Sequence, residues 1–233
     1  MPKGTAHYQR VLVKISGECF ERPALLTAIV RQLIRAHRRK VVLAVVVGGG
    51  NIVRGRDAGL RHHELPRVIA DKAGMLATII NGLYLTELLA ETVPVRHLCA
   101  FALPNFVDGF SLECAQDCLR SGSILVLSGG TGNPFFSTDS AAALRAAELE
   151  MEVILKGTWV KGIYSADPQK NRHARFYRRL SYERALTKRL NVMDPTAFAL
   201  CWERRIPIVV FDISRPNAIS DIIAGKQIGS LVC

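Results

Sequence analysis

The sequence predicts an α/β protein: a three-layer sandwich in which helices cover both faces of a mainly parallel central sheet. Three observations indicate this fold. Short apolar segments alternate along the chain with longer segments of helical periodicity. Several of the short segments are apolar throughout, as strands buried on both faces are. Glycine-rich loops follow directly on three of them, which is where ligand-binding loops lie in open parallel sheets.

The alternation is clearest in the N-terminal two thirds of the chain. An apolar segment predicts a strand over 10–15, helically spaced apolar residues predict a helix over 24–37, and a β-branched run predicts a strand over 40–47. Further strands are expected at 95–100, 124–127 and 153–156, and further helices at 68–89 and, in an alanine-rich segment, at 138–150.

The C-terminal part is less regular. A loop-rich stretch is expected up to about residue 179. Helices are then expected near Tyr182, near Pro195 and after Pro216, with strands over 208–211 and 229–232. Because neither an internal repeat nor a low-complexity linker interrupts the chain, we expect a single domain over residues 1–233.

The composition excludes several classes of protein. Hydrophobic residues make up 49% of the 233 residues, which is enough for a substantial core. The formal net charge of +11 indicates anionic partners, but no basic stretch carries the interleaved aromatic residues of a nucleic-acid motif. The longest apolar run, 41–47, is far shorter than the roughly 20 residues of a membrane span. We therefore expect nucleotides as ligands, and neither a membrane nor a nucleic acid as partner.

Cysteine usage and the N-terminal sequence favour a cytoplasmic protein. The six cysteines form no Cys-x-x-Cys motif, so the pattern favours reduced thiols over a zinc site. The first residues show neither an apolar core segment nor a small-residue cleavage site, so we expect no signal peptide.

The glycine loops indicate an anion-binding site. Ser16-Gly17 follows the first strand, Gly48-Gly49-Gly50 follows the second, and a loop over 128–133 follows the strand at 124–127. Glycine lets backbone N–H groups approach a phosphate. The P-loop and dinucleotide-binding signatures are both missing, so neither of those folds is indicated.

Polar residues near these loops each have two interpretations. Lys14, near the end of an apolar strand, is either a lysine that extends to solvent or a cation that bridges phosphates. Asp139, at the start of a helix, is either a helix cap or a carboxylate that orients a lysine or holds magnesium. The segment 162–168 is either an ordinary turn or a loop that closes over a base and ribose.

Several segments carry a family resemblance, in order, over nearly the whole chain. They are 13–18 (Val-Lys-Ile-Ser-Gly-Glu), 47–55, 70–78, 130–139 (Gly-Thr-Gly-Asn-Pro-Phe-Phe-Ser-Thr-Asp), 162–168 and 191–194 (Asn-Val-Met-Asp). Together they resemble the bacterial UMP kinase branch of the amino acid kinase family. The Thr-Gly-Asn-Pro-Phe-Phe sequence is specific for this branch, whereas the lysine and triple-glycine segments occur more widely in the superfamily.

This resemblance implies a fold, an activity and a set of partners. It implies the amino acid kinase fold, with the acceptor-binding part roughly within 1–150 and the ATP-binding part roughly within 151–233. It implies transfer of a phosphoryl group from ATP to UMP in pyrimidine nucleotide synthesis, by a cytoplasmic homohexamer. It implies Mg²⁺ as cofactor, held mainly through the ATP phosphates rather than in a metal site of the protein.

The resemblance also implies roles for individual residues. Those that would organise catalysis are Lys14, Asp139 and Asp194. Those that would bind ATP are Lys14, Ile15, Ser16, Gly17, Gly50, Arg54, Thr158, Tyr164 and Asp167. Those that would bind UMP are Gly49, Asp71, Thr131, Gly132, Asn133, Pro134, Phe135, Phe136, Ser137 and Thr138.

The chain departs from the family pattern in three places. The glycine-rich loop that usually follows Ser-Gly-Glu is absent, and residues 18–23 lead almost directly into a helix. Trp159 stands where lysine is common, and Lys161 stands where the family has aspartate. A His62-His63-Glu64 segment has no assigned role. The first departure bears on effector binding and the second on ATP affinity.

Two other functions stay open at this point. One is an amino acid kinase that acts on a carboxylate, a carbamate or isopentenyl phosphate; the 131–138 segment argues against it. The other is a protein of the same fold that binds oxyanions or nucleotides without turnover. The presence of both Lys14 and Asp139 argues for an enzyme instead.

Overall fold

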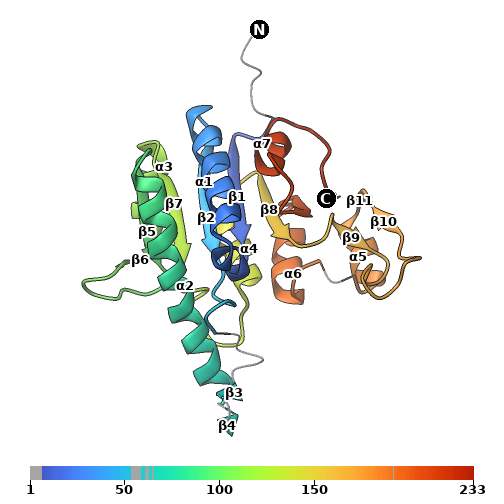
Figure 1. Cartoon of the computed structure of the whole chain (residues 1–233), viewed down its shortest axis with the longest axis horizontal. Coiled ribbons are helices and arrows are strands. Elements are labelled where there is room, and N and C mark those ends of the chain that lie inside the picture. The colour runs from blue at the N-terminus through green and yellow to red at the C-terminus, as the bar shows by residue number, and fades with distance from the viewer. Residues whose placement is uncertain (1–6, 54–58, 61–62, 65, 191) are drawn as a thin grey trace.

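The computed structural model describes residues 7–53, 59–60, 63–64, 66–190 and 192–233, and a nine-stranded sheet forms its middle layer (Figure 1). The strands of this sheet are β1 (Arg10–Ile15), β2 (Val42–Val47), β5 (Val95–Cys99), β6 (Asp108–Gly109), β7 (Ile124–Ser128), β8 (Val153–Thr158), β11 (Arg179–Leu180), β12 (Ile208–Asp212) and β13 (Ser230–Val232). They lie in the order β11-β13-β12-β8-β1-β2-β7-β5-β6. Neighbouring strands are parallel except β12 and β13, which confirms the prediction of a mainly parallel sheet.

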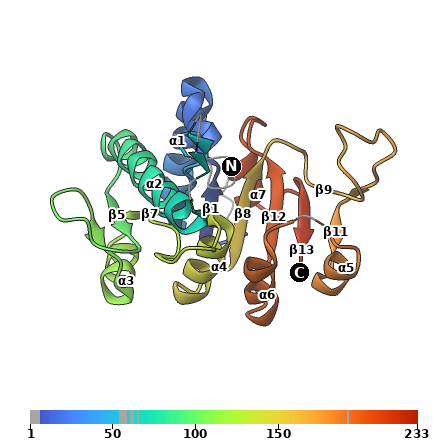
Figure 2. The same ribbon diagram turned by 90° about the horizontal axis from the view of Figure 1, so that it is seen from below.

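Helices cover both faces of this sheet, and Figure 2 shows the three layers from the side. One face carries α1 (Pro23–Arg38), α2 (Arg67–Ala90) and α7 (Ala218–Ile223). The other face carries α3 (Leu112–Arg120), α4 (Thr138–Glu148), α5 (Tyr182–Thr187) and α6 (Pro195–Glu203). A short 3₁₀ helix, η1 (Gly17–Glu21), joins β1 to α1.

The two faces of the sheet bury separate apolar clusters. In β1, Val11 and Val13 belong to the cluster shared with α1, α2 and α7, and Leu12 belongs to the cluster shared with α3 to α6. All three side chains are fully buried. Because the central strands are covered on both faces, neither side of them needs polar residues, which explains their apolar sequences.

The structure contains elements that the sequence pattern does not predict. The helix α3 is one, although the i, i+4 spacing of Cys114 and Cys118 agrees with it. The loop-rich stretch before residue 179 contains a hairpin of β9 (Ile163–Tyr164) and β10 (Phe176–Tyr177). A second hairpin, of β3 (Gly59–Leu60) and β4 (His63–Glu64), precedes α2.

In the described part of the chain, α2 alone is long and apolar enough to cross a membrane by length and composition. Its inner side packs against the sheet, where Leu85 and Leu89 are fully buried in the same cluster as β1 and β2. A core helix of a globular protein meets the same length and composition test. Its packing therefore accounts for its apolar sequence.

The helix α2 approaches β5 closely at Gly82. A Cβ atom on Gly82 would lie 2.4 Å from Nε2 of His97. His97 is buried, and its Nε2 lies 2.8 Å from the hydroxyl oxygen of Ser128. Burial lowers the pKa of His97 to about 4, so the ring is neutral near pH 7. The packing of α2 on the sheet thus depends on the missing side chain at position 82.

We predict that Gly82→Ala destabilises the protein by roughly 1–3 kcal/mol, because the added methyl group overlaps the buried His97 ring. Gly74→Ala in the same helix is the matched control, since a Cβ there meets no atom within 4 Å. Its higher helix propensity should stabilise the protein by up to about 1 kcal/mol. Urea unfolding measures both variants, and equal free energies of unfolding would contradict the packing argument.

Candidate active site

Glycine-containing loops meet at the carboxyl edge of the sheet. Because β1, β2 and β7 are parallel neighbours, the loops that follow them lie at the same edge. The N–H of Gly48 donates to the carbonyl of Ile15 at 2.9 Å. A Cβ on Gly17 would lie 2.4 Å from the Asn51 side chain and 2.6 Å from the Gly50 nitrogen. Only glycine therefore lets the first two loops touch at position 17.

Two side chains of α2 hold these loops in place. The buried amide of Asn81 donates to the Gly48 carbonyl at 2.7 Å and to Asn51 Oδ1 at 2.8 Å. The hydroxyl of Thr78 accepts the N–H of Gly129 at 2.7 Å. The helix thus fixes the loop after β2 and the loop after β7 through separate hydrogen bonds.

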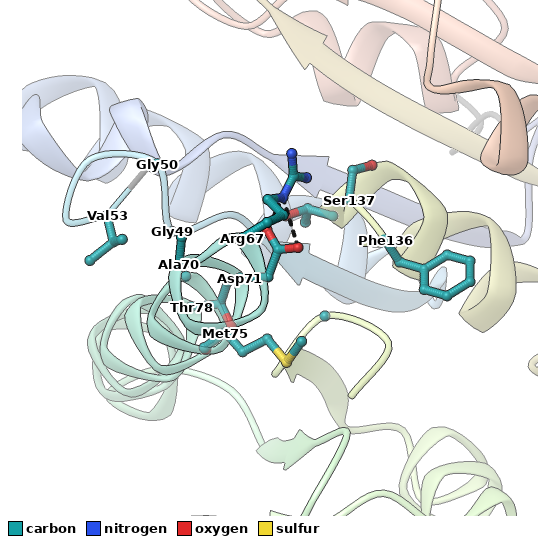
Figure 3. A pocket seen from close by; sticks show the side chains of 13 residues that line it. Gly49, Gly50, Val53, Arg67, Ala70, Asp71, Met75, Thr78, Phe136 and Ser137 are labelled. Atoms are coloured by element: carbon teal, nitrogen blue, oxygen red, sulfur yellow. Dashed lines mark hydrogen bonds and ion pairs between the residues drawn. The ribbon is translucent and has the colours of Figure 1, made fainter. Parts of the chain in front are cut away.

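A cavity of about 220 Å³ opens between these loops, α2 and the N-terminal end of α4 (Figure 3). Its lining combines backbone groups of glycines, hydroxyl groups, an arginine and a carboxylate, a mixture suited to a polar, anionic ligand. The lining residues are Gly49, Gly50, Val53, Arg67, Ala70, Asp71, Gly74, Met75, Thr78, Gly130, Phe136, Ser137 and Thr138.

Asp71 places the carboxylate in this cavity. Arg67, one helical turn earlier, donates through Nε to both Asp71 oxygens at 2.8 and 2.9 Å, as Figure 3 shows. The N–H of Phe135 donates to the same carboxylate at 2.8 Å. Phe135 has a φ of 73°, a left-handed conformation that is costly for a bulky residue. Asp71 thus holds the 131–138 segment against α2.

The adjacent strands β1 and β8 bring two lysines to one carboxylate. The strands pair in parallel with Lys14 opposite Lys156. Lys14 Nζ lies 3.0 Å from Oδ1 of Asp139, and Lys156 Nζ lies 2.5 Å from Oδ2. Lys156 also donates to the Val192 carbonyl at 2.6 Å. The lysine side chains are each 14% exposed and that of Asp139 is 13% exposed, so the cluster is largely shielded from water.

Electrostatics keep Asp139 ionised in this cluster. Burial would raise the pKa of Asp139, but the ammonium groups of Lys14 and Lys156 outweigh it and lower the pKa to about 2. Because this value lies below the unfolded value of 3.8, the carboxylate stabilises the fold above about pH 4. That stabilisation is lost as the pH falls towards 2. Burial also lowers the pKa of Lys156, against the opposing attraction of Asp139.

Ser137 and Asp194 fix the helix that carries Asp139. The Ser137 hydroxyl oxygen accepts the N–H groups of Asp139 at 3.0 Å and of Ser140 at 3.3 Å. Ser137 is therefore the cap of α4, and the interpretation of Asp139 as a simple helix cap is wrong. Asp194 caps α6 and accepts hydrogen bonds from the hydroxyls of Ser137 and Ser140, so it ties α6 to the start of α4.

A second cavity, of about 340 Å³, lies beside the loop after β8. Tyr164 and Asp167 line it, together with Lys188 and Arg189. The ring of Phe176 packs 5.3 Å from that of Tyr164. An aromatic ring, a carboxylate and cationic side chains in one cavity can accommodate a base, a ribose and phosphates.

The structure brings the residues expected to bind UMP to the first cavity or the loop beside it. Gly49, Asp71, Phe136, Ser137 and Thr138 line the cavity. Residues 131–135 are not among its lining residues; they form the loop that leads to it, and the Phe135 N–H donates to the lining carboxylate of Asp71.

The residues expected to bind ATP are more dispersed. Tyr164 and Asp167 line the second cavity, whereas Gly50 lines the first. Ile15 is fully buried, so only its backbone can face a ligand. The Thr158 hydroxyl lies 2.9 Å from the Val160 carbonyl, and Thr158 lines neither cavity. Arg54 and His62 lie outside the described residues.

Sequence reasoning missed several residues of the site. The most important is Lys156, whose signal was its position near the end of an apolar strand, as for Lys14. Arg67 could have been inferred from its i, i+4 spacing to Asp71. Asn81 has no signal in the sequence, because polar residues are common in helices, and Thr78 stands out only as the last residue of the 70–78 segment that carries the family resemblance. Among the described residues, no group of three or more His, Cys, Asp or Glu side chains could hold a metal ion.

Comparison with known proteins agrees with this geometry. A sequence model of the amino acid kinase family matches residues 9–212. Curated relatives named uridylate kinase, from Legionella pneumophila (strain Paris) and Aeromonas salmonicida (strain A449), are 40% and 41% identical to this chain. Each match covers 97% of this chain, and 94% and 95% of the respective relative.

Solved structures give the same result. The crystal structure of a UMP kinase from Ureaplasma parvum matches with a TM-score of 0.89 at 37% identity, over 97% of this chain and 99% of that chain. The crystal structure of a UMP kinase from Bacillus anthracis matches with a TM-score of 0.92 at 31% identity, over 97% and 96%. Family model, relatives and fold agree over nearly the whole length, and the chain therefore belongs to the amino acid kinase family.

Proposed function

We propose that this chain is a UMP kinase, which transfers the terminal phosphoryl group of ATP to UMP and forms UDP in pyrimidine nucleotide synthesis. The observation that carries the proposal is the cluster of Lys14, Asp139 and Lys156 at the carboxyl edge of the sheet. It lies at the start of the same helix whose first residue, Thr138, lines the cavity that contains Asp71. The names and the similarity of the relatives support UMP as the acceptor.

The first cavity suits the acceptor nucleotide. Asp71 bonds to Arg67 and to the Phe135 backbone, but a carboxylate offers about four acceptor sites. Capacity therefore remains for the ribose hydroxyls of UMP. The backbone N–H of Gly49 and the hydroxyl of Thr138 provide donors for its phosphate.

The second cavity and the loop after β1 suit the donor nucleotide. Tyr164 offers a face for the adenine ring and Asp167 offers acceptors for the ribose. Ser16 and Gly17, directly after β1, offer backbone N–H groups to the phosphates. Arg54 and Thr158 remain predicted ATP contacts.

The chemistry requires charge neutralisation more than proton transfer. The attacking atom is a phosphate oxygen, which is already ionised near pH 7, so no strong general base is needed. Lys14 and Lys156 stabilise the negative charge on the phosphoryl group during its transfer. Asp139 holds both ammonium groups in position and takes no proton itself, in agreement with its low pKa. Asp194 acts on this arrangement through the start of α4.

Mg²⁺ fits this site as an ion bound mainly by the ATP phosphates. Both Asp139 oxygens already contact lysines, and the described residues offer no cluster of three metal ligands. Mg²⁺ accepts such sparse ligation, because it retains several waters and binds substrate phosphates. When bound, it would neutralise charge on the phosphates.

The two alternative functions are less favoured. An acceptor other than UMP is less favoured, because the relatives that match this chain over nearly their full length are named uridylate kinase. A protein that only binds oxyanions would not need two lysines organised by a buried carboxylate. A cytoplasmic location accompanies the proposed role in nucleotide synthesis.

The outer side of α2 supports self-association, with a homohexamer as the expected assembly. Apolar side chains there are between 39% and 64% exposed, and such contiguous patches mark interfaces. A symmetric contact between copies would cover them. These residues are Ile69, Leu76, Ile80, Leu83 and Tyr84.

The first prediction of this proposal concerns turnover. With ATP and Mg²⁺, a coupled assay should show UMP as the preferred acceptor over CMP, dUMP and acetylglutamate. Lys14→Met should lower kcat about 10²–10³-fold, because a preorganised cation is lost. Lys226→Met, which removes an exposed lysine paired with Asp221, is the matched control and should leave kcat unchanged. Near-normal turnover in folded Lys14→Met protein would refute the role of Lys14.

The second prediction concerns the acceptor ribose. Asp71→Asn keeps an oxygen for the Phe135 N–H but removes the negative charge. We expect the KM for UMP to rise roughly tenfold, and the preference for UMP over dUMP to shrink, because a hydrogen bond to a charged group is weakened. Steady-state kinetics with both acceptors measure this, and an unchanged preference would contradict the assignment.

The third prediction concerns assembly. Ile80→Glu should dissociate the oligomer into smaller species, because it places a charge in the apolar stripe of α2. Arg204→Glu, at the exposed C-terminal end of α6 on the other face of the sheet, is the control and should leave the assembly intact. Light scattering after size-exclusion chromatography gives the mass, and an unchanged mass for Ile80→Glu would exclude this stripe as the interface.

A further inference from the structure

Trp159 joins two loops that the proposed function assigns to ATP. It follows β8 directly, and its indole Nε1–H donates to the carboxylate of Glu18 in η1, which follows β1. The guanidinium carbon of Arg22 lies 4.2 Å from the centre of the Trp159 ring. Because β1 and β8 are neighbours in the sheet, these three side chains span the space between the loops that follow the two strands.

The contact is anchored on both sides. Trp159 is partly buried and packs, with Phe20 of η1, against the apolar cluster beneath α1 and α7. On the other side, the N–H of Cys19 donates to the carbonyl of Ser16 at 3.1 Å, so η1 is tied to the residue that precedes Gly17. A movement of Trp159 would therefore be transmitted within a few residues to the Ser16-Gly17 backbone.

Both contacts are of strong types. The indole hydrogen bond ends on a carboxylate, and hydrogen bonds to ionised groups are stronger than those between neutral groups. An arginine over a tryptophan face adds a cation–π attraction. Glu18 thus binds the N–H edge of the indole while Arg22 lies over its face, so two different contacts constrain the ring.

We propose that Trp159, Glu18 and Arg22, here called the Trp159 cluster, are positioning residues for the donor nucleotide. The cluster sets the separation between the loop that receives the ATP phosphates and the loop that leads to the base and ribose cavity. Loops that are already aligned lose less conformational freedom on binding, so the cluster increases affinity for ATP. This inference rests on the proposed function. None of the three residues lines the acceptor cavity, so UMP binding is unaffected.

Kinetics of matched variants test the proposal. Trp159→Phe keeps an aromatic ring for Arg22 but removes the N–H donor to Glu18. Arg22→Ala keeps the hydrogen bond between Trp159 and Glu18 but removes the cation–π contact. We expect either to raise the KM for ATP roughly 5- to 30-fold while the KM for UMP and kcat stay within about twofold. Glu18→Gln keeps an acceptor oxygen and should show a smaller effect. Trp202→Phe, on α6 and 44% exposed, is the control and should change nothing.

A turnover-independent readout separates this proposal from the proposed function. The chain has two tryptophans, so in Trp202→Phe protein the fluorescence comes from Trp159 alone. A non-hydrolysable ATP analogue should change this emission, and UMP should not. If the unmodified chain fails to phosphorylate UMP, the proposed function fails, but this titration still decides the inference.

Two results would overturn the proposal. One is Trp159 emission that does not respond to the ATP analogue, with unchanged affinity for the analogue in Arg22→Ala protein. The other is an equal rise of both KM values together with a lower free energy of unfolding in urea, which would show that the cluster only stabilises the fold.

Discussion

Two lysines can occupy the same edge of the sheet only because Asp139 lies between them. The parallel register of β1 and β8 places Lys14 opposite Lys156, and two shielded ammonium groups repel each other strongly. The carboxylate neutralises one charge and contacts both groups. Removing one partner from a buried ion pair costs about 3–5 kcal/mol. The site therefore depends on the position of the α4 start, which places Asp139 between the lysines. Ser137 and Asp194 fix this position by holding the start of α4 against α6.

The second requirement is a fixed set of loops, and α2 supplies it. Asn81 and Thr78 bind the loops after β2 and β7 from one side of this helix. Asp71, about two turns before Thr78 and about three before Asn81, reaches into the cavity that those loops enclose. The outer side of the same helix carries the apolar stripe proposed as an interface. Assembly would therefore brace the helix that shapes the acceptor cavity, which links oligomer formation to acceptor binding.

Features that depend on the local sequence pattern could be predicted from the sequence, whereas contacts that depend on how strands and helices pair could not. Strand and helix segments were predictable from periodicity, and Lys14 and Asp139 from their places in recognisable segments. Lys156 could not be assigned, because only the pairing of β8 with β1 shows that it faces the same carboxylate. In the sequence, Asn81 looks like any polar residue of a helix, and only the structure shows that it binds the Gly48 carbonyl. Trp159 stood out only as a departure from the family pattern. Its contact with Glu18 joins residues far apart in the sequence and becomes visible only in the tertiary structure.

Lys14 and Lys156, held by Asp139, are proposed to contact the phosphoryl group during its transfer. A crystal structure with UMP and a non-hydrolysable ATP analogue tests it most directly. We expect the terminal phosphate of the analogue to lie within hydrogen-bond distance of Lys14 Nζ, with the UMP phosphate beside Gly49 and Thr138 in the first cavity. A complex in which both nucleotides bind while the terminal phosphate lies away from both lysines would contradict it.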